Sequence, residues 1–236
     1  MNMCSKCVLP ESFPGIRFNQ EGTCQYCLSA KPLREMHDLK EKYRKKFCKL
    51  LDEFKSQGPY DIVMAYSGGK DSSYTLKILK DDFGLRVLAI TFDNGFASEQ
   101  ALKNIKKVTG TLNIDHLMVS PNFALLSHVF KQSITTKLYP LKALERASSI
   151  CNTCMNLVKS YVLKTAIENG ISFIAYGWSP GQAPIQSSVM ALNQSMIQQM
   201  QKMMKNTLKE IMGDDLAPFI LSDRHDALIE MKITDS

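Results

Sequence analysis

The chain has 236 residues, of which 44% are hydrophobic, and this is enough for one large folded domain with a small appendage. Its 29 Lys and Arg against 23 Asp and Glu give a net charge of +6, which suits an anionic ligand such as a nucleotide but does not by itself indicate nucleic-acid binding. No stretch approaches the roughly 20 consecutive apolar residues that cross a bilayer, and no signal-peptide pattern opens the chain. We therefore expect a soluble protein without a membrane partner, located in the cytoplasm.

Two pairs of cysteines mark residues 1–32, a segment that is short of apolar periodicity. Cys4 and Cys7 form the first pair, and Cys24 and Cys27 form the second after a gap of sixteen residues. A two-residue spacing lets neighbouring thiolates reach one ion at tetrahedral angles, and a bound metal orders a segment that is too small for a core. We predict a structural Zn²⁺ site in this module, with an iron–sulfur cluster such as [4Fe-4S] as the alternative.

A connector helix is expected over residues 33–58. Apolar residues recur there every three or four positions, which is typical of an amphipathic helix, and Gly58-Pro59 ends the pattern. They are Met36, Leu39, Tyr43, Phe47, Leu50, Leu51 and Phe54.

Residues 59–182 alternate between β-prone runs and helical stretches. We expect strands over residues 61–66, 86–92, 115–120 and 172–177, and helices reaching residue 82 and covering 98–109, 123–138 and 155–169. This order predicts an α/β fold, a Rossmann-like parallel sheet with helices on both faces. Ligands of such sheets bind beyond the carboxyl ends of the strands.

The last segment, residues 183–236, is predicted to be a helical extension. Its part from residue 189 to 212 favours helix and is dense in methionine, including Met196, Met200, Met203 and Met204. Helical packing or a homodimer surface is the expected role, and a flexible substrate-binding surface is the alternative.

A glycine-rich loop follows the first predicted strand. Glycines let the backbone turn tightly and approach a phosphate, and the helix behind them offers unpaired N–H groups and the positive end of its dipole. The serines add hydroxyl donors, Lys70 adds a positive charge, and Asp71 is a candidate ligand of Mg²⁺. The spacing differs from GxxxxGK[ST], and an acid follows the lysine. The loop consists of Ser67, Gly68, Gly69, Lys70, Asp71, Ser72 and Ser73.

The segment AYSGGKDSS, which begins at Ala65, resembles the signature of the PP-loop ATP pyrophosphatases. The resemblance extends to residues 91–95, whose Phe92 matches the strand end that borders adenine, and to Gly177 in a late nucleotide-contacting turn. It implies an adenine nucleotide alpha hydrolase-like fold and the cleavage of ATP between its α and β phosphates, with adenylation of a substrate oxygen. It also implies nucleotide contacts by Ala65, by the loop from Ser67 to Ser73, by Phe92 and by Gly177.

The sequence from Cys7 to Cys27, CVLPESFPGIRFNQEGTCQYC, resembles the N-terminus of lipopolysaccharide N-acetyl sugar amidotransferases. These enzymes are a PP-loop branch that takes ammonia from a glutaminase partner. The placement of the pairs is also similar to that in tRNA thiolases that begin with a zinc finger. The cysteine pairs do not decide between these branches.

Another pair, Cys151 and Cys154, follows a polar stretch from Arg146 to Ser149 and directly precedes a predicted helix. A thiol at a helix N-terminus has a lowered pKa, so we expect one of the two to be a nucleophile at neutral pH. The PP-loop thiolases have a cysteine pair at this place, which implies delivery of persulfide sulfur or the binding of an iron–sulfur cluster. A structural pair and a further metal knuckle are the alternatives. For a three-cysteine cluster the chain is one ligand short, because only Cys48 is left over.

These features together predict an ATP-dependent sulfurtransferase with Cys151, Cys154 and Asp71 as catalytic residues. Its partners are ATP, a sulfur donor and an acceptor, either a small molecule or a tRNA. The segment from Trp178 to Gln182 stands where many thiolases carry a histidine and paired acids, and this departure favours the small molecule. The alternatives are an amidotransferase that uses ammonia from a glutaminase, and a zinc-knuckle nucleic-acid binder with a regulatory nucleotide site.

Overall fold

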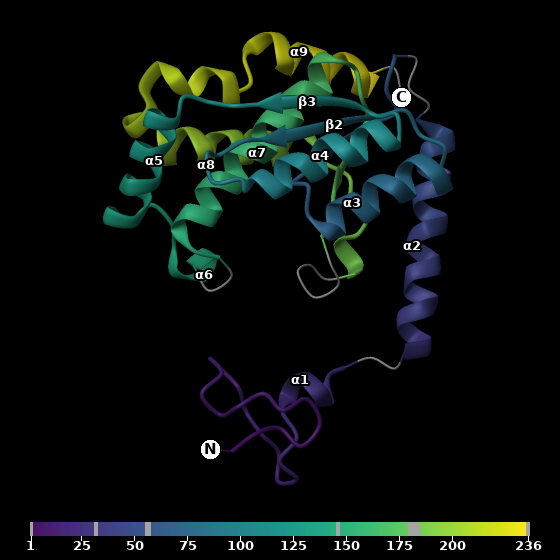
Figure 1. The fold of residues 1–236 in the computed structure, drawn as a ribbon, viewed down its shortest axis with the longest axis vertical. Coiled ribbons are helices and arrows are strands. Elements are labelled where there is room, and N and C mark those ends of the chain that lie inside the picture. The colour runs from purple at the N-terminus through teal and green to yellow at the C-terminus, as the bar shows by residue number, and fades with distance from the viewer. Residues whose placement is uncertain (1, 31–32, 55–57, 145–146, 179–184, 235–236) are drawn as a thin grey trace. The chain divides into compact units, whose positions relative to one another are not determined.

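The computed structural model describes residues 2–30, 33–54, 58–144, 147–178 and 185–234 (Figure 1). The chain divides into two compact units, Met1–Leu50 and Leu51–Ser236. The predicted division into four segments at residues 32, 58 and 182 is finer than this and stays a prediction.

The N-terminal unit begins with turns and two isolated antiparallel bridges, Met3 with Pro10 and Phe18 with Cys24. A single helical turn, α1 (Gln25–Leu28), follows Cys24, and α2 (Leu33–Glu53) is the predicted amphipathic helix. Cys4 and Cys24 are buried, although the segment around them holds few apolar residues. The cysteines therefore form the centre of this module.

The second unit is built on a sheet of four parallel strands, which confirms the predicted α/β class. The strands are β1 (Ile62–Ala65), β2 (Val87–Phe92), β3 (Asp115–Val119) and β4 (Phe173–Tyr176), in the order β3-β2-β1-β4. Ile62 of β1 lies opposite Val87 of β2 and Phe173 of β4. The strand order reverses between β1 and β4, and this reversal opens a crevice at their carboxyl ends.

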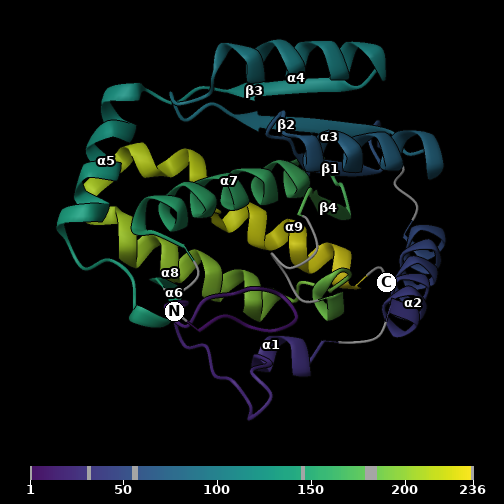
Figure 2. The same cartoon turned by 60° about the horizontal axis from the view of Figure 1, so that its bottom comes forward.

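Helices cover both faces of the sheet (Figure 2). The first face carries α3 (Lys70–Lys77), which continues into a π-helical turn (Ile78–Asp82), and α4 (Glu99–Thr111). The other face carries α7 (Ser149–Glu168), which follows α5 (Phe123–Thr135) and the short α6 (Leu141–Leu144). Crossovers between parallel strands are right-handed, so the reversal of strand order places α7 opposite α3 and α4. A core of Val63, Ile90, Val162, Ala166 and Ile171 joins α7 to the sheet.

The start of α7 corrects the sequence-based prediction, which began this helix at residue 155. The side chain of Ser148 caps the helix by accepting a hydrogen bond from the amide of Cys151, and Ile150 packs on the core. Because a serine cap and an apolar anchor favour an early start, the first turns are helical despite their polar composition. Cys151 and Cys154 therefore lie inside the helix and not ahead of it.

Helices also build the C-terminal part of the unit. They are a 3₁₀ turn (Ile185–Ser187), α8 (Gln194–Met212), a second 3₁₀ segment (Gly213–Phe219) and α9 (Asp223–Thr234). Met204, Leu208 and Met212 of α8 join Leu126 of α5 and Leu157 of α7 in a core, which confirms the expected helical packing. No helix in the described part of the chain is long and apolar enough to cross a membrane.

Candidate functional site

The glycine-rich loop connects the carboxyl end of β1 to α3. Within the described residues, no side chain caps the N-terminus of α3, whose N-cap residue is Gly69. The Ser67 and Ser72 hydroxyls lie 3.0 Å apart, and Ser72 Oγ donates to the carbonyl oxygen of Gly69. An uncapped helix N-terminus beside two hydroxyls can receive a phosphate.

The charged residues of the loop are accessible. Lys70 Nζ lies 2.7 Å from Asp71 Oδ1, and the Lys70 side chain is 88% exposed. An exposed ion pair is weak, because water screens it, so an incoming phosphate and its cation can separate the two groups. The binding of Mg²⁺ by Asp71 stays a prediction.

Two glycines of the site stand where a side chain would collide with the backbone or a core residue. Gly68 has φ +74°, and a Cβ on it would lie 2.6 Å from Ile105 Cγ1 of α4. A Cβ on Gly177, which follows β4, would lie 2.4 Å from Ser72 Cα. The loop after β1 and the turn after β4 are therefore in direct contact at the crevice of the sheet.

The other predicted nucleotide-contacting residues lie at the same edge. Ala65 is the last residue of β1, and Phe92 is the last residue of β2. The Phe92 ring packs 6.0 Å from the Phe219 ring, so its side chain belongs to the core and its contact with adenine stays a prediction.

A network of hydrogen bonds beneath the glycine-rich loop supports it. The Tyr66 hydroxyl lies 3.0 Å from Ser73 Oγ, and Thr91 Oγ1 donates to the Tyr66 carbonyl oxygen at 2.7 Å. His116 Nε2 lies 2.8 Å from Thr91 Oγ1. Because the single hydroxyl proton of Thr91 is used on Tyr66, His116 Nε2 must carry the proton and donate it. Burial lowers the pKa of His116, which keeps this neutral donor form.

The cysteine pair of α7 reaches the carboxyl end of β2. Asn94 Nδ2 donates to Cys154 Sγ at 3.6 Å, and Asn94 Oδ1 accepts from the Phe96 amide at 3.0 Å. Cys151 is exposed, whereas Cys154 is half-buried. One thiol is therefore open to an external donor, and the other lies beside the loop after β2.

The pKa of Cys154 is raised, so Cys154 is not the thiol of the pair for which we expect a lowered pKa. Burial raises this pKa, the hydrogen bond from Asn94 lowers it, and the neighbouring Cys151 raises it, with a net upward shift. Cys154 lies in the second turn of α7, where the field of the helix N-terminus has weakened.

A cation that no sequence motif marks lies beside Trp178. Lys159 Nζ of α7 lies 5.3 Å from the centroid of the Trp178 ring, which also stacks on Tyr176 at 5.6 Å. Trp178 directly follows Gly177 and is 47% exposed. The remainder of the segment that departs from the thiolase pattern, residues 179–182, lies outside the described residues.

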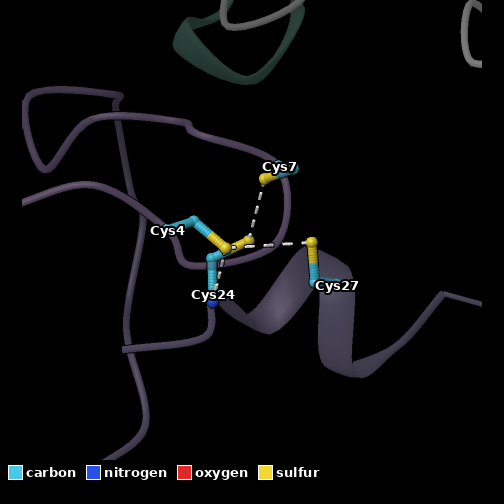
Figure 3. Close-up of side chains that lie close together, drawn as sticks. All are labelled: Cys4, Cys7, Cys24 and Cys27. Atoms are coloured by element: carbon cyan, nitrogen blue, oxygen red, sulfur yellow. Dashed lines mark hydrogen bonds between the residues drawn. The ribbon is translucent and has the colours of Figure 1, made fainter. Parts of the chain in front are cut away.

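The four N-terminal cysteines form a candidate metal centre. Figure 3 shows their sulfur atoms turned toward one another from the two knuckles. All four lie within 4.8 Å of one another, with Cys4 and Cys27 sulfurs 3.8 Å apart and Cys7 and Cys24 sulfurs 3.6 Å apart. A tetrahedral ion with Zn–S bonds of about 2.3 Å places its sulfurs about 3.8 Å apart, so the residues fit a single ion.

Backbone amides prepare this centre for metal. Burial alone would raise the pKa of Cys4, but the amides of Cys24, Cys7 and Lys6 stabilise its thiolate and lower the pKa to about 6. The hydrogen bond between the side chains of Cys27 and Cys7, together with burial, raises the pKa of Cys27 to about 12. Four converging thiolates repel one another, and a cation removes that repulsion.

Comparisons with known proteins agree with the geometry. The family model described as "Queuosine biosynthesis protein QueC" matches residues 61–205. The protein MJ1599 of Methanocaldococcus jannaschii is 28% identical over 175 residues, covering 74% of this chain and 58% of that protein. The GMP synthase [glutamine-hydrolyzing] of Baumannia cicadellinicola is 24% identical over 186 residues, covering 75% of this chain and 35% of the relative.

Among solved structures, the U34-tRNA thiolase NcsA from Methanococcus maripaludis aligns with a TM-score of 0.41 and 19% identity, over 99% of this chain and 73% of that chain. The chain spans less than two thirds of the length of both curated relatives described above. The match to the family model covers more than half of the chain and includes the glycine-rich loop, the cysteine pair of α7 and Gly177. The protein therefore belongs to the QueC family of PP-loop ATP-using enzymes.

Proposed function

We propose that the protein binds ATP on the loop from Ser67 to Ser73 and transfers AMP to a carbonyl oxygen of an acceptor, with release of pyrophosphate. The observation that carries this proposal is the uncapped N-terminus of α3 in contact with Gly177 across the β1–β4 crevice. Main-chain N–H groups aimed at one point stabilise the charge that accumulates on the leaving pyrophosphate.

The residues of the loop divide this work. The Ser67 hydroxyl turns from Ser72 to donate to a phosphate oxygen, and Lys70, once it leaves Asp71, adds a positive charge. The Asp71 carboxylate holds Mg²⁺, which neutralises the polyphosphate. ATP, Mg²⁺ and an acceptor are thus the components of the first step.

Sulfur is the first candidate for the group that replaces the activated oxygen, because the Cys151–Cys154 pair lies at the carboxyl edge of the sheet. A persulfide donor would load the exposed Cys151. The terminal sulfur attacks the adenylated carbon, AMP leaves, and Cys154 then attacks the Cys151 sulfur, which releases the thiolated product and leaves a Cys151–Cys154 disulfide. A cellular dithiol reduces that disulfide for the next cycle.

Ammonia is the second candidate, and two observations favour it. The raised pKa of Cys154 leaves little thiolate at neutral pH. The name of one relative, GMP synthase [glutamine-hydrolyzing], describes an enzyme that hydrolyses glutamine. In this case a glutaminase partner supplies ammonia, which attacks the adenylated carbon directly, and the acceptor is an N-acetyl sugar.

The N-terminal cysteines serve a structural role in either case. Their single-ion geometry supports Zn²⁺, and [4Fe-4S] is the alternative. The acceptor is a small molecule or a tRNA, and the protein works in the cytoplasm. A homodimer is the expected assembly if the outer face of α8, which carries the exposed Met203, is an interface.

Isotope labelling separates the two nucleophiles. The purified protein is incubated with ATP, Mg²⁺, a small-metabolite or tRNA fraction, and either a ³⁵S persulfide donor or ¹⁵N-ammonium. AMP and pyrophosphate formation supports the adenylation step, and the label found in the product identifies the nucleophile. Sulfur transfer requires that Cys151→Ser and Cys154→Ser both abolish release of free labelled product while ATP affinity stays unchanged, because Cys154→Ser leaves the labelled acceptor attached to Cys151. Absence of ATP binding by calorimetry would refute the whole proposal.

A further inference from the structure

Lys159 has no anionic partner within the described part of the protein. It lies on α7, half-buried, with its ammonium near the face of Trp178 and not near a carboxylate. Burial lowers its pKa, since water is partly withdrawn from the charge. A half-buried cation without a counter-ion costs free energy that an anionic ligand would return.

The position of Lys159 directs it to the nucleotide crevice. α7 connects β3 to the parallel strand β4, so it runs against the strands, and its N-terminus lies at their carboxyl edge. Helical side chains point toward the N-terminus of their own helix, so the Lys159 ammonium extends toward that edge.

A short series of neighbouring residues links Lys159 to the glycine-rich loop. Lys159 contacts Trp178, Trp178 follows Gly177, and Gly177 abuts Ser72 in the first turn of α3. Lys70 belongs to the first turn of α3 and Lys159 belongs to α7, so the two lysines come from helices on opposite faces of the sheet. The two lysines therefore flank the same opening from opposite faces of the sheet.

We propose that Lys159 is a second phosphate-binding cation of this site. Its ammonium moves away from the Trp178 ring and contacts an anionic oxygen of the nucleotide. This rests on the proposed function for the identity of the ligand. The anionic oxygen belongs either to the α-phosphate that stays on AMP or to the pyrophosphate that departs. Lower solvent access makes the contact stronger than one from an exposed lysine.

Trp178 is the single tryptophan of the chain, so its fluorescence reports this contact without labelling. The wild type, Lys159→Met and Lys159→Arg are titrated with ATP, AMP, pyrophosphate and the uncharged probe adenosine, in a phosphate-free buffer. Lys131→Met, on the exposed side of α5, is the matched control. Affinities are measured in parallel by calorimetry.

We expect AMP or pyrophosphate to change the Trp178 fluorescence of the wild type and not of Lys159→Met. We also expect Lys159→Met to bind the responsible ligand about tenfold more weakly or worse, while adenosine binding and the Lys131→Met control stay unchanged. A loss for AMP assigns Lys159 to the α-phosphate, and a loss for pyrophosphate assigns it to the leaving group. Lys159→Arg should retain part of the affinity.

Equal affinities of Lys159→Met and wild type for AMP and for pyrophosphate would overturn this inference and leave the proposed ATP binding intact. Failure of the wild type to bind ATP would instead overturn the proposed function. Circular dichroism of each variant checks that the fold is retained.

Discussion

Gly177 and Ser72 touch across the crevice of the sheet, since a Cβ on Gly177 would stand 2.4 Å from Ser72 Cα. No rotamer change relieves this overlap, because the obstacle is backbone. The turn after β4 thus fixes the first turn of α3. The position of the glycine-rich loop therefore depends on Gly177, which lies 105 positions after Ser72 in the chain.

Gly177→Ala should displace the first turn of α3. We expect ATP affinity to fall more than tenfold and the free energy of unfolding to drop by about 1–3 kcal/mol, the usual cost of overpacking. Calorimetry and urea denaturation measure the two effects. Gly110→Ala is the control, because nothing lies within 4 Å of its added Cβ and alanine favours the helix there. Wild-type ATP affinity in Gly177→Ala would show that this contact does not position the loop.

Metal at the four N-terminal cysteines should protect their thiols. In the metal-loaded protein we expect three of the seven cysteines to react with a thiol reagent, and all seven to react after a strong chelator removes the ion. Metal affinity should fall as the pH falls, because protons compete for the thiolates. Elemental analysis should give one ion per chain, and Cys24→Ser should abolish it whereas Cys48→Ser should not. Two or more irons with sulfide would instead indicate a cluster.

His116 should make stability depend on pH. Its pKa in the folded protein is below the ordinary 6.5, so the unfolded chain binds more protons in the window beneath that value. The stabilising contribution is present above pH 6.5 and is lost as the pH falls through the folded pKa. His116→Gln retains a nitrogen donor for Thr91 but does not titrate, so the difference in unfolding free energy between wild type and variant should change between pH 7 and pH 5. A constant difference would show that the pKa of His116 is not lowered in the folded protein.

Asn94 should control the reactivity of Cys154. Its hydrogen bond lowers the pKa of this thiol, so Asn94→Ala should raise it and slow alkylation of Cys154 at pH 7.5 by about fivefold, as expected for one hydrogen bond of about 1 kcal/mol. Peptide mass spectrometry after timed iodoacetamide treatment measures the rate. Cys151 is the internal control, since Asn94 makes no contact with it that would change its rate. Faster alkylation of Cys154 would show that the substitution opens the loop after β2, and that the gain in access to Cys154 outweighs the effect of its raised pKa.

The sequence predicts the sheet and the position of the glycine-rich loop between β1 and α3 well, because both depend on local signals. Apolar β-prone runs mark all four strands, and the glycines and serines after Tyr66 mark the loop. The start of α7 is predicted wrongly, since a polar run from Ser148 to Thr153 has the composition of a loop and only the serine cap and the burial of Ile150 make it helical.

Contacts between distant residues explain the rest. Asn94 and Cys154 are 60 positions apart and meet only because β2 and α7 share one edge of the sheet. No sequence motif surrounds Lys159, and its proposed role depends on its contact with Trp178, which follows β4 in the chain. The raised pKa of Cys154 follows from packing that spacing alone does not reveal.

The side chains with proposed roles in the reaction, Cys151, Cys154 and Lys159, all belong to α7, whose Leu157 and Val162 anchor two separate hydrophobic cores. Their mutual spacing is therefore set by a helix that is held in both cores. Any displacement of α7 would therefore move all three side chains together relative to the glycine-rich loop.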